Sequence, residues 1–149
     1  MSTTDHVESF IRAFRHLGAL YTRLAARQSA VRGEATKQEL LALGVLGQSG
    51  PLRMSDLAER LGIGQSAVTP VVDRLEARGL ARRTRSRADR RVWLVELTSE
   101  GEQVFAEEDA VYREVVAAML APLDPSERAT LAALMEKITA AGMAEVPGE

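Results

Sequence analysis

The feature that most constrains the fold is a change of hydrophobic period at Gly79. Before this glycine, apolar residues recur with helical spacing, and glycine-containing turns separate the segments. After it, residues 80–85 and 91–97 are predicted to be two short strands joined by the polar loop 86–89, and the alternation in 92–97 supports a strand with one buried face. The chain is therefore predicted to be mainly α with one small β-hairpin. Its 149 residues, 46% of them hydrophobic, suffice for one ordinary domain with a buried core.

Residues typical of helix ends predict three helices before the hairpin. The sequence Thr-Lys-Gln-Glu at 36–39 is a capping box, which predicts a helix up to about Gln48. A shorter helix is predicted over about 55–61, with Gly62 in the left-handed C-cap position. A third is predicted over about 65–78. The inward face of this third helix is predicted to consist of Val68, Val71, Val72 and Leu75.

A long helix is also predicted near the N-terminus, over residues 5–31. Its apolar side chains repeat every seven residues in two series, Val7, Phe14, Tyr21 and Phe10, Leu17, Leu24, Val31. Such a stripe packs against another helix, either in the same chain or in a second copy. We favour the second copy, because the aromatic content is high for a helix with so little chain around it.

Two further helices are predicted after the hairpin. Thr98 is a suitable N-cap for a helix that extends to about Leu120. The sequence Asp-Pro-Ser-Glu at 124–127 marks the start of the last helix, which reaches about Ala141. Residues 145–149 are predicted to fray. The acidic run Glu107-Glu108-Asp109 is interpreted as a solvated helix face.

Positive charge is concentrated around the hairpin. Residues 60–91 carry nine arginines against three acidic residues, although the whole chain has a net charge of -2. This distribution favours a surface for a polyanion, with a solvated charged face as the alternative. Helices followed by a basic hairpin predict a winged helix-turn-helix, whose second helix enters the major groove of DNA. The predicted division places a winged helix-turn-helix at 36–97, with a recognition helix at about 65–78 and a wing at about 80–97.

Residues 56–101 resemble the DNA-binding core of the MarR family of transcriptional regulators. The matching residues, in order, are Leu57-Ala58, Leu61-Gly62, Val68-Thr69, Asp73-Arg74-Leu75-Glu76, Gly79-Leu80, Asp89-Arg90-Arg91 and Leu97-Thr98 with Gly101. The resemblance implies a homodimer, with a helical dimerisation region formed by 1–35 and 98–149. Such a dimer binds pseudo-palindromic promoter DNA, in most members as a repressor. The resemblance also implies a cleft between the dimerisation and DNA-binding parts, where a small aromatic or anionic effector would bind and release the DNA.

The candidate DNA contacts lie on the second and third predicted helices and on the wing. They are Ser55, Gln65, Ser66, Thr69, Arg74, Arg87, Arg90 and Arg91. Short polar side chains at a helix N-terminus suit phosphates and base edges. By the resemblance, Arg91 enters the minor groove and Asp89 orients a wing arginine through a charge-assisted pair. Arg82 and Arg83 are predicted to be partly structural, paired with Glu76 or Asp73, and Trp93 to anchor the wing against the recognition helix.

Two departures from the family pattern affect the expected mechanism. Pro70 lies inside the recognition helix, where many relatives carry arginine, so one backbone donor and one base-reading side chain are lost. The chain has no cysteine, which excludes the peroxide sensing that some members perform through a thiol. Phe10, Phe14 and Tyr21 are weaker candidates for the effector cleft, because core or dimer packing is the favoured interpretation of these side chains.

Other classes of function have little support. No Ser/His/Asp set, phosphate loop or metal cluster stands out, so no catalytic residue, cofactor or metal is expected, and the chain is not predicted to be an enzyme. No apolar stretch of membrane-spanning length and no secretory leader is present, so no membrane partner and a cytoplasmic location are expected. The main alternative is a winged-helix module that binds protein without specific DNA recognition.

Overall fold

The structure is a computed structural model that describes residues 3–142. Residues 3–114 form one compact unit and residues 115–142 a second. The elements are α1 (Thr3–Ala25), α2 (Ala30–Gly33), α3 (Lys37–Ser49), α4 (Met54–Leu61), α5 (Gln65–Ala77), β1 (Ala81–Arg85), β2 (Trp93–Leu97), α6 (Ser99–Leu120) and α7 (Pro125–Gly142). This is the predicted mainly α fold with one β-hairpin. The segment 145–149, predicted to fray, lies outside the described residues.

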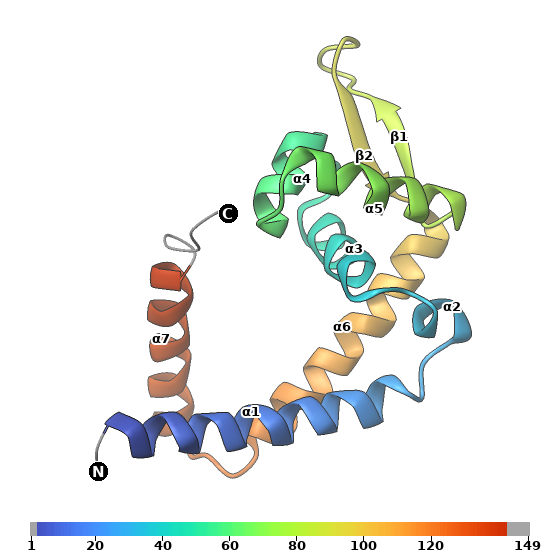
Figure 1. The fold of residues 1–149 in the computed structure, drawn as a ribbon. Coiled ribbons are helices and arrows are strands. Elements are labelled where there is room, and N and C mark those ends of the chain that lie inside the picture. The colour runs from blue at the N-terminus through green and yellow to red at the C-terminus, as the bar shows by residue number, and fades with distance from the viewer. Residues whose placement is uncertain (1–2, 143–149) are drawn as a thin grey trace. The chain divides into compact units, whose positions relative to one another are not determined.

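The core of the first unit lies where α3, α4 and α5 pack against the hairpin (Figure 1). All four residues of the predicted inward face of α5 are buried there, which confirms the helical period. Their neighbours in the core include Leu43, Leu46, Leu57, Leu80 and Val95. Leu52 and Val95 exchange two backbone hydrogen bonds, of 3.0 and 2.7 Å, which fasten the segment before α4 to the hairpin.

The predicted end signals have the expected geometry. The Oγ1 atom of Thr36 accepts a hydrogen bond from the backbone N–H of Glu39 (3.2 Å), and the Glu39 carboxylate accepts one from the N–H of Thr36 (2.6 Å). Gly62 ends α4 with a φ of 66°, in the left-handed region. In the second unit, Asp124 and Glu127 form the same reciprocal pair at the start of α7. These local predictions are confirmed.

The hairpin is antiparallel, with paired residues from Ala81 and Leu97 at its base to Arg85 and Trp93 at its outer end. Residues 86–92 form the connecting loop. Thr98 fastens the base, because its Oγ1 donates to the carbonyl of Gly79 (2.5 Å) and accepts from the N–H of Gly101 (3.1 Å). The hairpin therefore projects from the core while α6 begins beneath it (Figure 1).

The single helix predicted over 5–31 is wrong, because α1 ends at Ala25 and α2 begins at Ala30. Ser29 caps α2 by accepting a hydrogen bond from the N–H of Arg32 (3.3 Å). The Glu107 carboxylate in turn accepts from the N–H (3.2 Å) and the hydroxyl (2.7 Å) of Ser29. These contacts from α6 favour the start of a new helix at α2 over continuation of α1. The break between the two helices orients the Arg32 side chain into the protein interior.

Within residues 3–142, no helix combines the length and the apolar composition that crossing a bilayer requires.

Candidate nucleic-acid interface and adjoining cavity

The first turns of α4 and α5 carry the predicted polar contacts at accessible positions. Gln65, Ser66 and Thr69 on α5 are exposed, and Ser55 is exposed in the first turn of α4. At a helix N-terminus, free backbone N–H groups and the helix dipole both favour an anion. A DNA phosphate can therefore be held there while the side chains of α5 reach base edges.

Arg74 and Pro70 also lie on α5. The Arg74 side chain is about half exposed, and its Nε atom lies 3.7 Å from a carboxylate oxygen of the buried Glu39. Pro70 lies inside the helix, which continues to Ala77. Pro70 is exposed, and so is Ser66, whose carbonyl loses its helical donor. The hydrogen bond that the proline removes is therefore on the solvated surface of α5, where water can replace the donor. The buried face of the helix is unaffected.

Five of the six arginines of the hairpin fall into two groups, and the first group has acidic partners within the protein. Arg82 pairs with Glu96 across the hairpin, at 2.7 Å. Arg83 binds Glu76 and Asp73 of α5, the latter at 2.8 Å. The structural role predicted for both is confirmed, although the partner of Arg82 is a strand residue.

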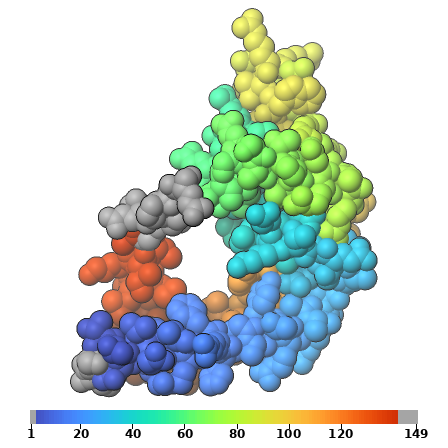
Figure 2. Space-filling view, in the orientation of Figure 1, coloured from blue at the N-terminus to red at the C-terminus, as the bar shows by residue number. Residues whose placement is uncertain are grey.

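The second group consists of Arg87, Arg90 and Arg91, all exposed in the wing loop. Within residues 3–142 the structure gives their guanidinium groups no hydrogen bond, ion pair or ring contact. In the space-filling view the outer end of the hairpin projects beyond α4 and α5 (Figure 2). The wing loop therefore presents three guanidinium groups at the end of a projecting hairpin, which can lie along a groove of DNA.

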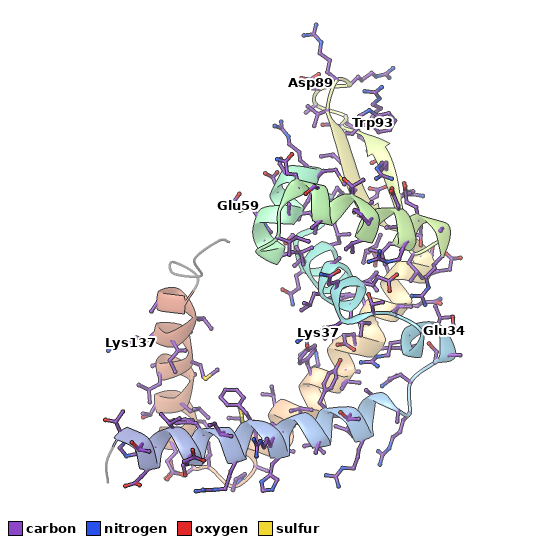
Figure 3. All side chains as sticks on the ribbon, viewed as in Figure 1. Glu34, Lys37, Glu59, Asp89, Trp93 and Lys137 are labelled. Carbon is purple, nitrogen blue, oxygen red and sulfur yellow. The ribbon has the colours of Figure 1, made fainter. Side chains whose placement is uncertain are left out.

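Asp89, at the outer end of the hairpin (Figure 3), makes a different contact from the one predicted. Its Oδ1 atom accepts a hydrogen bond from the backbone N–H of Arg91 (2.9 Å). Among the described residues, no arginine side chain lies within ion-pair distance of it. The tight turn, closed by a bond from the N–H of Val92 to the carbonyl of Asp89 (3.0 Å), brings the backbone amide within reach of this short side chain. Asp89 therefore shapes the loop and leaves the Arg91 guanidinium free.

A cavity of about 300 Å³ lies in the same unit, between α1, α2, α3 and α6. Its lining is Tyr21, Arg32, Lys37, Leu40, Leu41, Glu108 and Tyr112. This volume is at the lower end of the range for small-molecule sites. The combination of apolar, aromatic and charged side chains suits a small ring that carries an anionic group.

A buried ion pair forms one wall of this cavity. Arg32 is 7% and Glu108 4% exposed, and the Arg32 Nε donates to the Glu108 carboxylate at 2.9 Å. The Tyr21 hydroxyl donates to the same carboxylate and accepts from the Arg32 Nη2 (2.7 Å). Burial, together with the hydrogen bond to Glu108 and its charge, raises the pKa of Tyr21. Tyr21 therefore remains a neutral phenol that can donate to Glu108.

The same carboxylate affects two further ionisable groups of the cavity wall, Arg32 and Tyr112. Burial alone would lower the pKa of Arg32, but the hydrogen bond and charge of Glu108 outweigh it and raise the pKa. Burial and the charge of Glu108 also raise the pKa of Tyr112, whose ring lies 5.4 Å from that of Tyr21. The cavity wall therefore holds one paired cation and two neutral phenols.

Comparison with known proteins identifies the family. A family model described as MarR family matches residues 35–93. The HTH-type transcriptional repressor MdtR of Bacillus subtilis (strain 168) is 33% identical over 143 residues, which cover 95% of this chain and 91% of the relative. The chain belongs to the MarR family. It is a DNA-binding regulator of transcription with a winged-helix fold.

Solved structures agree with this assignment to the MarR family. The crystal structure of RV1404 from Mycobacterium tuberculosis matches with a TM-score of 0.76 and 28% identity, covering 95% of both chains. BpsR from Bordetella bronchiseptica, whose DNA binding is regulated by 6-hydroxynicotinic acid, matches with a TM-score of 0.65 and 25% identity. That match covers 93% of this chain and 99% of BpsR.

The cavity of this MarR-family chain was only partly anticipated by the sequence. Tyr21 lines it as predicted, but Phe10 and Phe14 do not. Phe14 shares a helix face with Tyr21 but lies one heptad away, about 10 Å along the axis. Glu108, interpreted from the sequence as solvated, is buried. Arg32 and Glu108 are 76 residues apart, so no local pattern indicated that they would pair.

Proposed function

We propose that this chain is a homodimeric repressor that binds a pseudo-palindromic operator. It releases the operator when a small aromatic carboxylate enters the cavity between α1, α2, α3 and α6. The observation that carries this proposal is the pairing of two features in one unit. The first is a wing with three arginines whose guanidinium groups have no partner among residues 3–142. The second is a cavity with cationic and aromatic walls, whose neighbouring residues contact the recognition helix α5. The DNA-binding role follows from the family, whereas dimer, operator and effector are inferred.

Exposed apolar side chains on α1 and α7 support the homodimer. Phe10 and Phe14 are 64% and 70% exposed, and no residue of α1 is fully buried. In the second unit, α7 separately exposes Leu134, Met135 and Ile138. A helix whose heptad stripe is in water gains most by packing on another helix. The proposed dimerisation region is therefore the predicted one, residues 1–35 and 98–149.

Replacing Phe14 by Asp is expected to convert the dimer to a monomer at micromolar concentration. Each dimer would lose two buried aromatic side chains, worth roughly 1.5–3 kcal/mol each, and would bury two unpaired charges. Sedimentation equilibrium measures the change, and Phe14→Leu is the matched control that keeps an apolar side chain. A dimer constant unaffected by the aspartate would show that α1 is not at the interface.

The chemistry of the cavity supports a carboxylate effector. Lys37 lines the cavity (Figure 3), and within residues 3–142 the structure gives its ammonium group no hydrogen bond or ion pair. Arg32, in contrast, is neutralised by Glu108. A carboxylate would therefore be bound by Lys37, while its ring packs against Tyr112, Leu40 and Leu41. BpsR, which responds to 6-hydroxynicotinic acid, provides a precedent for this class of ligand.

Contacts between the cavity wall and α5 provide a route for release. Arg78, the C-cap residue of α5, donates from Nη2 to the carbonyl of Val31 in α2 (2.5 Å). Its Nη1 atom lies 3.6 Å from Glu39 in the first turn of α3, close to Lys37. The residues that flank Arg32 and Lys37 therefore also hold the end of α5. A ligand that displaces α2 or the start of α3 would change the position of α5 in the groove.

The Lys37→Gln variant is expected to retain DNA binding but lose most of its response to aromatic carboxylates. The chain has two lysines, so Lys137→Gln, an exposed position on α7, is the matched control for loss of one positive charge. The measurement is release of fluorescent operator DNA by titrated 4-hydroxybenzoate, salicylate and 6-hydroxynicotinate. Equal release from both variants would exclude Lys37 as the carboxylate ligand.

Selection of bound duplexes from a random pool, at physiological salt, tests the proposed function as a whole. The expected product is an inverted repeat with half-sites about 34–36 Å apart, one turn of DNA. Recovery of no motif, with binding lost above low salt, would refute operator recognition and favour a module that binds protein.

A further inference from the structure

Arg85 and Trp93 form the outermost residue pair of the hairpin, immediately below the wing loop. The Arg85 guanidinium carbon lies 3.9 Å from the centre of the Trp93 ring, in a cation–π stack. Trp93 is 49% exposed and shares a surface pocket with Met54 of α4 and Thr69 of α5, so its anchoring against α5 stays a prediction beside the stack on Arg85. Alternation along β2 places Trp93 on the same face as the buried Val95 and Leu97.

The same guanidinium also binds the wing loop. Its Nη1 atom donates to the backbone carbonyl of Arg90, at 3.0 Å. Arg85 is therefore held on one side by the indole ring and on the other by the loop that carries the three free arginines. The loop is closed by a bond from the N–H of Ser86 to the carbonyl of Val92, at 2.9 Å.

We propose that Arg85 and Trp93 are positioning residues for DNA recognition, which hold the wing loop in the conformation that its free arginines need to bind DNA. This inference rests on the DNA-binding function of the chain. An ordered loop loses less conformational freedom on binding than a mobile one, so the stack strengthens binding without touching DNA. Arg85 differs in this respect from Arg87, Arg90 and Arg91, whose charges are available to phosphates.

The positioning role predicts a specific pattern of affinities for the full-length chain and its selected operator duplex. Trp93→Ala is expected to weaken binding about fivefold, while Trp93→Phe, which keeps an aromatic face, stays within about twofold of the wild type. Arg85→Lys is expected to resemble Trp93→Ala, because an ammonium group cannot stack flat on the ring and bind the Arg90 carbonyl at once. The double variant should be no weaker than either single one, since both remove the same stack.

Salt dependence distinguishes positioning from direct contact. If Arg85 only positions the loop, Arg85→Gln leaves the slope of log K against log salt unchanged. If Arg85 binds a phosphate, the slope becomes shallower by about 0.9, and Arg85→Lys binds almost as well as the wild type. That second outcome, or wild-type affinity in Trp93→Ala, would overturn the proposal. Failure of the wild type to bind any duplex would instead refute the proposed function.

Trp93 provides a readout that does not depend on DNA, because it is the single tryptophan of the sequence. Its fluorescence therefore reports the stack directly in the free protein. Arg85→Gln is expected to change the emission spectrum without changing the midpoint of thermal unfolding. An unchanged spectrum in the folded variant would show that the stack does not form in solution, and would also overturn the proposal.

Discussion

Simultaneous replacement of Arg87, Arg90 and Arg91 by alanine is expected to weaken operator binding about a hundredfold at physiological salt. Each guanidinium that contacts DNA contributes roughly 1–3 kcal/mol, and the contributions of three neighbouring contacts do not add fully. The slope of log K against log salt should become shallower by up to about 2.7, since each lost phosphate contact contributes about 0.9. Fluorescence anisotropy over a series of salt concentrations measures both quantities.

Single replacements within the hairpin provide the control for this effect. Arg91→Ala and Arg82→Ala remove the same charge from the same hairpin, but Arg82 is already paired with Glu96. Arg91→Ala is expected to cost about 1–3 kcal/mol of binding free energy, and Arg82→Ala much less. Equal losses would mean that only the net charge of the hairpin matters. A triple variant with wild-type affinity and slope would show that the wing does not contact DNA.

Gly101→Ala is expected to have the largest effect on stability, lowering the free energy of unfolding by about 3 kcal/mol or more. Gly101 lies in the first turn of α6, where Thr98 caps the helix. An added methyl group would overlap the carbonyl oxygen of Leu80 and lie 2.9 Å from its carbonyl carbon. Backbone atoms cannot move aside as a flexible side chain can, so α6 would separate from the base of the hairpin.

Gly44→Ala is the matched control, because Gly44 lies within α3 and an added methyl group there meets no atom within 4 Å. Alanine at such a position is expected to stabilise the helix by about 0.5–1 kcal/mol. Chemical denaturation of both variants, followed by circular dichroism, gives the two free energies. A stable Gly101→Ala variant would show that α6 can begin without this close approach to Leu80.

Features encoded by neighbouring residues could be predicted from the sequence. The capping box at Thr36, the left-handed Gly62 and the buried face of α5 depend on contacts within a few positions. The break before α2 could not be predicted in this way. The heptad series runs through it, and the Glu107 contact that stabilises the cap at Ser29 comes from a residue 78 positions away. A propensity for one helix was overridden by a tertiary contact.

The candidate site shows the same division. The sequence placed the arginine-rich loop in the wing, because composition and strand alternation are local. It indicated a structural role for Arg82 and Arg83 but gave no such role to Arg85, since that depends on the hairpin register that brings Trp93 opposite it. The cavity proposed for the effector was the least predictable part. Its ion pair joins α2 to α6, and neither residue has a sequence neighbour that reveals burial.

The choice of arginine for every basic residue of the wing limits how this protein can be regulated. Neither of the two lysines, Lys37 and Lys137, lies in the hairpin. A guanidinium group keeps its charge at any physiological pH, and lysine acetylation cannot neutralise it. The positive charge of the wing is therefore fixed against changes in physiological pH and against lysine acetylation. Under the proposed function, release of DNA by a small molecule must then come from a movement of the wing or of α5, and not from a loss of charge on the wing.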